Sequence, residues 1–167
     1  MERQPFTIDK VFWEHGKFKP WHISKDYVPT PLKDLNLGNG KEIVIVENED
    51  FSIGFLKSEV IYHHVVQGEF LGKALMVSYC VMCNAGVVME PIVDGEYLFF
   101  EPVGVYNGQL LLQDVKTKSL WNHLQGECIH GTFKGKQLKI AYLKEVLVKD
   151  ALLLNPELPM GISGKHK

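Results

Sequence analysis

Short runs of apolar residues, separated by glycine-containing or polar turns, recur along most of the chain. The runs are rich in Val, Ile, Leu and Phe and have the length of strands, roughly 4–8 residues. The pattern predicts strands at 42–46, 51–56, 60–66, 73–79, 86–91, 97–103, 109–115, 127–133 and 137–142, with hairpin turns at Asp94-Gly95 and at 134–136. Because many short strands follow one another closely, we expect a mainly β fold, either an antiparallel sandwich or a partly closed barrel.

Two parts of the chain depart from this pattern. Residues 1–40 are rich in aromatic residues and broken by prolines, so we expect an irregular N-terminal arm that is anchored on the domain by its aromatic side chains. Residues 143–154 carry apolar residues near helical spacing before Pro156, which predicts one short C-terminal helix. The expected organisation is the arm at 1–40, a β domain at 41–158 and a polar tail at 159–167.

Composition excludes several classes of protein. The chain has 167 residues, of which 46% are hydrophobic and 23% charged, as is typical of one soluble globular domain. A net charge of −2 gives no reason to expect nucleic acid or an anionic membrane as a partner. No apolar run approaches the roughly 18 residues that cross a bilayer, and the first residues lack the basic region and continuous apolar stretch expected of a secretory signal. With only three cysteines, a cytoplasmic location is expected.

Cys80 and Cys83 are the residues with the clearest chemistry. They lie between two apolar runs, which predicts a tight turn connecting two buried strands. Asn84 follows the second thiol, and Asn tolerates the left-handed backbone often needed at this place in a metal-binding turn. Two thiols at this spacing can bind one metal ion or close as a redox disulfide.

Several motifs together resemble a known family. They are Tyr62-His63-His64, Tyr79-Cys80 with Cys83, Val93-Asp-Gly95, Tyr106-Asn107 and Ser119-Leu-Trp121. In this order the motifs resemble the uncharacterised family called domain of unknown function 3179, over roughly residues 42 to 156. The resemblance implies a mostly β domain and brings no established activity. His64 stands where that family commonly has Glu, and Val81 stands where it has Pro.

A metal site is the first hypothesis for function. The thiolates of Cys80 and Cys83 and one imidazole are suitable ligands for a transition metal. Zinc and copper fit these ligands better than iron does, and three protein ligands leave one coordination position open. If residues 62–66 form a strand, only one of His63 and His64 faces the thiols, and the resemblance favours His63. Such a domain acts in metal transfer, with a metal-exchange partner, or in the chemistry of a small molecule. No phosphate-binding loop is present, so no nucleotide cofactor is expected.

Three alternatives remain open at this stage. The first is a dithiol–disulfide oxidoreductase, in which Cys80 attacks and Cys83 resolves. The second is a structural or protein-interaction domain that uses the aromatic arm, through which the chain can also form homo-oligomers. In the third, both cysteines are simply small buried residues. Candidate walls of a ligand pocket are Tyr79, Tyr106, Asn107 and Trp121, and a looser Cys/His cluster is formed by His123, Cys128 and His130.

Overall fold

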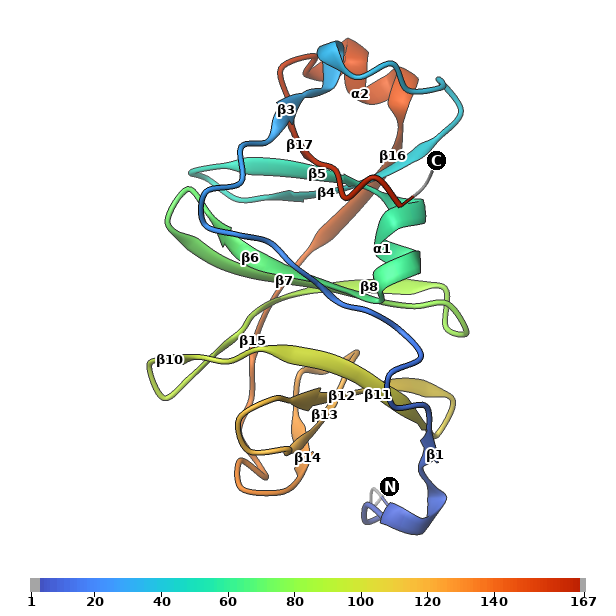
Figure 1. The fold of residues 1–167 in the computed structure, drawn as a ribbon, viewed down its shortest axis with the longest axis vertical. Helices are drawn as coiled ribbons and strands as arrows, with labels where there is room; N and C mark the ends of the chain where they lie inside the picture. Colours follow the sequence, from blue (N-terminus) through green and yellow to red (C-terminus); the bar gives the residue numbers. More distant parts are fainter. Residues whose placement is uncertain (1–3, 166–167) are drawn as a thin grey trace.

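The computed structural model describes residues 4–165, which fold into three five-stranded sheets stacked in layers (Figure 1). The upper sheet contains β16 (Leu143–Leu147), β4 (Glu42–Glu47), β5 (Ser52–Leu56), β17 (Pro159–Gly161) and β3 (Thr30–Pro31). The middle sheet contains β15 (Lys139–Ala141), β8 (Ala85–Glu90), β7 (Lys73–Cys80), β6 (Val65–Phe70) and β2 (Trp21–His22). The lower sheet contains β1 (Phe12–Trp13), β11 (Phe100–Tyr106), β12 (Gln109–Asp114), β13 (Leu120–Asn122) and β14 (Cys128–His130).

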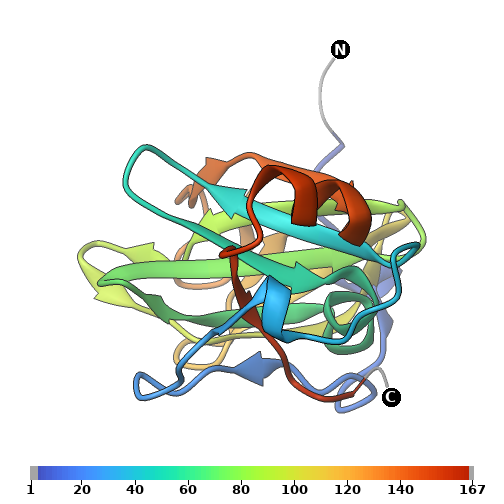
Figure 2. The same cartoon turned by 90° about the horizontal axis from the view of Figure 1, so that it is seen from above.

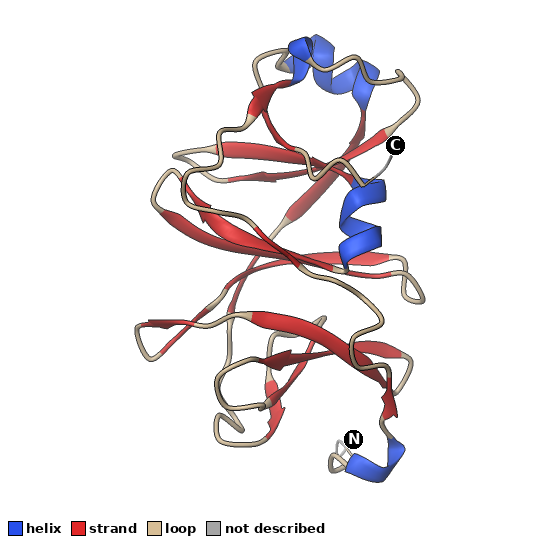
Figure 3. Cartoon of the chain, in the orientation of Figure 1, coloured by secondary structure: helices blue, strands red, loops and turns tan. Residues whose placement is uncertain are grey.

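Strands dominate the chain, as Figure 3 shows, which confirms the mainly β prediction. The sheets stay open, so the fold is a layered sandwich and no barrel closes among the residues described. The Asp94-Gly95 turn joins β9 (Ile92–Val93) to β10 (Glu96–Tyr97), as predicted, with both turn residues at positive φ. Of the second hairpin, predicted between residues 127–133 and 137–142, only an isolated antiparallel bridge between Glu127 and Gln137 forms, because β15 pairs with β8 of the middle sheet.

The middle sheet is buried on both faces, and this decides where the functional residues lie. Side chains alternate along β7, so Val77 and Tyr79 pack toward the upper sheet while Met76 and Cys80 pack toward the lower one. The upper interlayer core also contains Phe55. Because both faces of β7 are covered, its sequence is a nearly continuous apolar run.

Two α-helices are present in the described part of the chain, where one was predicted. The prediction of a strand at 60–66 is wrong at its start, since α1 (Lys57–His63) is helical and β6 begins only at Val65. Between them His64 ends the helix in a left-handed conformation, with φ 60°. The β-branched residues of this segment favoured a strand, but helical spacing buries Glu59, Val60 and His63 on one side of α1.

The predicted C-terminal helix is half as long as expected. Its first half is β16, which pairs with β4, and only α2 (Val148–Leu154) is helical. Pairing with an open sheet edge here prevails over the helical spacing of the apolar residues. Seen from above in Figure 2, α2 lies across the upper sheet, where Val148 and Ala151 pack against Ile43 and Ile45. No helix among residues 4–165 is long and apolar enough to span a membrane.

The N-terminal arm attaches to all three layers. Its short strands β1, β2 and β3 pair with β11, β6 and β17 respectively, so the arm runs along one side of the stack (Figure 1). It also contains two short 3-10 helices, η1 (Ile8–Lys10) and η2 (Leu32–Asp34). Residues 159–161, predicted as the start of a tail, instead form β17 between β5 and β3. Residues 1–3 of the predicted arm and 166–167 of the predicted tail lie outside the described residues.

Candidate functional site

The Cys80–Cys83 segment is a tight turn between β7 and β8, as predicted. The Asn84 amide donates to the Val81 carbonyl at 3.1 Å, and Asn84 adopts the left-handed conformation with φ 46°. The hydroxyl of Tyr79 reaches across the turn and donates to Asn84 Oδ1 at 2.9 Å. Asn84 therefore supplies both the backbone conformation that closes the turn and a polar partner for a buried tyrosine.

Cys80 and Cys83 form a disulfide, with their Cα atoms 5.4 Å apart. Cys80 is 3% exposed, whereas Cys83 is only half-buried. The backbone N–H of Cys83 lies 3.3 Å from Cys80 Sγ, and Cys83 Sγ lies 3.6 Å from the Gly108 carbonyl. When the pair is reduced, the Cys83 N–H donates a hydrogen bond to the Cys80 sulfur. This hydrogen bond favours the thiolate form of Cys80.

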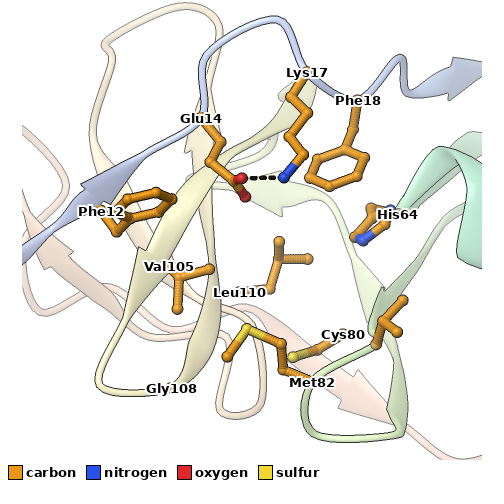
Figure 4. Close-up of a pocket in the computed structure, with 11 residues that line it drawn as sticks. Phe12, Glu14, Lys17, Phe18, His64, Cys80, Met82, Val105, Gly108 and Leu110 are labelled. Carbon is orange, nitrogen blue, oxygen red and sulfur yellow. Dashed lines mark hydrogen bonds and ion pairs between the residues drawn. The ribbon is translucent and has the colours of Figure 1, made fainter.

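A cavity of about 680 Å³, called the Cys80 pocket below, opens between the arm, α1 and the lower sheet (Figure 4). Its lining is mostly apolar and consists of Phe12, Phe18, Cys80, Val81, Met82, Val105, Gly108 and Leu110, with Glu14, Lys17 and His64 as the titratable side chains besides the cysteine. Glu14 and Lys17 form an ion pair with each other. The pocket thus places one sulfur of the disulfide at an apolar surface whose charges are already compensated.

His64 projects toward this pocket between Phe18 and Cys80 (Figure 4). The imidazole is buried and stacks on the Phe18 ring with 3.8 Å between centroids. Its Nδ1 is enclosed by protein, and the ring lies beside the helix backbone at Tyr62 and Ile61. Burial lowers the pKa of His64; hydrogen bonding to the Tyr62 and Ile61 backbone and the charge of Glu14 oppose this shift, and Lys17 adds to it, so the ring is a neutral base at neutral pH.

His63 lies on the other side of α1 and does not line the pocket. Its Nδ1 is 2.7 Å from the Lys19 carbonyl and its Nε2 is 2.9 Å from Ser163 Oγ, so the ring joins the arm to the C-terminal segment. The structure therefore brings His64, and not His63, to the cavity that Cys80 lines. The prediction of His63 assumed that side chains alternate along a strand. His63 is instead the last residue of α1 and His64 follows it in a left-handed conformation, so the two side chains point in different directions for another reason.

The predicted pocket walls lie elsewhere. Tyr79 is in the upper interlayer core, on the face of β7 opposite to Cys80. Trp121 is in the lower core, where its Nε1 donates to Asp114 Oδ2 at 3.0 Å. Tyr106 and Asn107 line a separate polar cavity of about 530 Å³ at the end of the lower sheet. None of these four residues lines the Cys80 pocket.

The looser Cys/His cluster does not gather around one point. His123 is fully buried, and its Nδ1 lies 2.6 Å from Ser78 Oγ. Burial lowers the pKa of His123 to about 4; the Ala85 backbone opposes this shift and His64 adds to it. Cys128 is buried, and burial raises its pKa to about 11, whereas the His130 ring packs against Phe6 in a tilted arrangement. Across residues 4–165, no three His, Cys, Asp or Glu side chains are grouped so as to hold a metal ion.

Comparison with known proteins places the chain in a family. The family model described as "Protein of unknown function (DUF3179)" matches residues 22–157, which is most of the three-layered domain and includes the Cys80–Cys83 turn. No curated protein and no solved structure matches the chain. The resemblance expected from the sequence motifs is thereby confirmed: this chain belongs to the DUF3179 family.

Proposed function

We propose that this protein is a dithiol–disulfide oxidoreductase whose active pair is Cys80 and Cys83. One observation supports this above the others: the disulfide lies at the end of β7 with Cys80 lining a cavity large enough for a small molecule. A structural disulfide gains nothing from an adjoining cavity. A redox pair needs one, because its partner has to approach a sulfur atom along the S–S axis.

In the reduced protein Cys80 is the nucleophile and Cys83 the resolving thiol. Cys80 lines the pocket and accepts a hydrogen bond from the Cys83 amide, which stabilises its thiolate. The neutral imidazole of His64 shares the pocket and serves as the base that takes the Cys80 proton. The half-buried Cys83 is three residues away and within bonding distance of Cys80.

The exchange moves two electrons. The Cys80 thiolate attacks a substrate disulfide, forming a mixed disulfide and releasing the first substrate thiolate, which takes the proton held by His64. The Cys83 thiolate then attacks Cys80 Sγ, releases the second substrate thiolate and closes the Cys80–Cys83 bond. The substrate disulfide is reduced by two electrons and the protein dithiol is oxidised by two. A thiol reductant drives the same steps in reverse and regenerates the dithiol.

Turnover with an aromatic disulfide and dithiothreitol tests this proposal. We expect the protein to accelerate the reduction, the Cys80→Ser variant to be inactive, and Cys128→Ser to retain activity. The Cys83→Ser variant should accumulate a mixed disulfide on Cys80, visible by mass spectrometry. Equal activity of wild type and Cys80→Ser would contradict the proposal, and unreactive thiols after reduction would indicate a purely structural pair.

His64 and His63 provide a matched pair for the role of the base. His64→Gln should slow alkylation of Cys80 at neutral pH about tenfold or more. A plot of the alkylation rate against pH should then lose the transition that titration of the imidazole causes. His63→Gln removes two hydrogen bonds outside the pocket, so it should lower stability while leaving the alkylation rate nearly unchanged. An effect of equal size in both variants would contradict the assignment.

A second candidate is transition-metal binding by the reduced pair, with His64 in the place expected for His63. The geometry of the turn favours this candidate. The Cys83 amide donates a hydrogen bond to Cys80 Sγ, Asn84 is left-handed after the second thiol, and the buried His64 imidazole shares the pocket. Thiolates and an imidazole suit zinc or copper. Elemental analysis of anaerobically purified protein tests it: metal that is lost in Cys80→Ser and His64→Ala supports this candidate, and its absence after reconstitution contradicts it.

A further inference from the structure

The Cys80 pocket limits what kind of molecule can react with the disulfide. Cys80 is almost fully buried, so a reaction partner reaches it through the cavity. A volume of about 680 Å³ falls in the range of small-molecule sites. Phe12 and Phe18 line the cavity from the arm, while Val105 and Leu110 line it from the lower sheet.

The charge of the pocket selects a neutral ligand. Glu14 and Lys17 are paired with each other, and no other Asp, Glu, Lys or Arg among residues 4–165 lines the cavity. A charged oxidant such as glutathione disulfide would have to bring several ionised groups against apolar walls without partners. An uncharged apolar molecule loses nothing comparable on entry and gains from burial.

One polar ring lines this otherwise apolar site besides the compensated Glu14–Lys17 pair. It is the imidazole of His64, which is only 7% exposed. Buried polar groups in proteins almost always have hydrogen-bond partners, so an imidazole in an apolar pocket favours a ligand with a hydrogen-bonding oxygen. An aromatic carbonyl compound supplies both that oxygen and a flat ring for the aromatic walls.

We propose that the Cys80 pocket binds a neutral, apolar quinone that accepts electrons from the reduced Cys80–Cys83 pair, an inference that rests on the proposed oxidoreductase function. The two thiols lose two electrons and two protons and form the disulfide. The quinone gains the two electrons and two protons and leaves as the hydroquinone. His64 donates a hydrogen bond to one carbonyl oxygen and passes it the proton taken from Cys80.

Anaerobic mixing of the reduced protein with a short-chain ubiquinone tests the inference. Every ring position of this probe is substituted, so thiols oxidise without adding to the ring. We expect one hydroquinone formed per disulfide, and a rate about tenfold above that with glutathione disulfide at the same concentration, the ratio set by apolar burial. The quinone is followed by absorbance and the thiols by mass spectrometry.

Two exposed phenylalanines serve as variant and control. Phe12 lines the pocket and is 67% exposed, so Phe12→Gln should fold and yet slow oxidation by the quinone about fivefold to tenfold. Phe99 is 46% exposed and lies outside the pocket, so Phe99→Gln should leave the rate unchanged. Equal rates in the two variants would overturn the inference.

The outcomes separate the inference from the function on which it rests. If glutathione disulfide closes the pair through Cys80 while the quinone does not, the quinone assignment is wrong and the oxidoreductase stands. If neither compound oxidises the pair and the disulfide exchange assay also fails, both are wrong. Addition of the probe to Cys80 without disulfide formation would likewise overturn the quinone assignment.

Discussion

The α-carbon of Gly104 lies directly against the backbone carbonyl of Phe12, so close that a β-carbon at Gly104 would overlap the Phe12 oxygen. Gly104 belongs to β11 and pairs with Trp13 of β1, next to a register shift in the ladder. The absence of a side chain at this position lets the arm lie on the lower sheet and form one wall of the Cys80 pocket.

Gly104→Ala should therefore detach the arm locally and open the Cys80 pocket. We expect a loss of about 1–3 kcal/mol in the free energy of unfolding and faster alkylation of Cys80 in the reduced protein. Urea unfolding and alkylation kinetics measure the two effects. Gly38→Ala is the control, because a β-carbon there meets no atom within 4 Å. Unchanged Cys80 reactivity in Gly104→Ala would show that the arm does not limit access.

The two roles of Asn84 can be separated by two substitutions. Asn84→Gly keeps the left-handed conformation but removes the partner of the Tyr79 hydroxyl, whereas Asn84→Ala loses both. We expect Asn84→Ala to be less stable than Asn84→Gly by about 1 kcal/mol in urea unfolding, because a β-carbon disfavours positive φ. Equal stabilities would mean that the backbone of the turn relaxes.

His123 should make the protein sensitive to acid. Burial lowers its pKa from the ordinary 6.5 to about 4, so between these values the unfolded chain binds a proton that the folded chain does not. Stability therefore falls as the pH drops through this window, by up to roughly 3 kcal/mol at its lower end. Urea unfolding at about pH 7.5 and about pH 4.5 measures the loss.

The matched variants for this pH dependence are His123→Gln and His15→Gln. The first removes the buried imidazole, so the difference in stability between the two pH values should shrink. The second changes an exposed histidine and should leave the difference intact. Identical pH dependence in both variants would assign the acid sensitivity to other groups.

The three cysteines should react at two different stages. Cys128 is 1% exposed and its pKa is raised to about 11, so the oxidised native protein should show no rapidly alkylated thiol at neutral pH. Unfolding without a reductant should release one thiol, since the other two of the chain's three cysteines are joined. Reduction of the folded protein should expose Cys80 and Cys83 to alkylation while Cys128 stays protected. Mass spectrometry after each step identifies the modified residue.

The mainly β character of the fold could be predicted from the sequence because apolar runs and turn residues encode strands locally, whereas the stacking of three sheets could not. The Asp94-Gly95 hairpin and the left-handed Asn84 belong to the same class of local signal. The helix α1 was missed because Val60 and Ile61 favour strands, while its helical form depends on burial of one face against distant segments. Tertiary packing there outweighs local preference.

The candidate site could be predicted only in part. The spacing of Cys80 and Cys83 identifies a pair with chemistry, and the structure joins them. Which histidine accompanies them depends on how α1 ends, and strand alternation gave no information on this. Phe12 and Phe18 were expected as aromatic anchors of the arm, but nothing in their spacing indicates that they line a cavity with Cys80. A pocket whose walls come from segments far apart in the sequence cannot be predicted from local sequence patterns.

The position of β17 constrains the order in which this protein folds during synthesis. The strand sits between β5 and β3, so residues 159–161 join two strands that were made far earlier in the chain. Until those residues leave the ribosome, β5 has an unpaired edge and β3 has no strand to join. Such non-local pairing is slow and leaves apolar strands open to association with other chains. A nascent chain stalled before residue 159 is therefore expected to depend on chaperones more than the finished protein does.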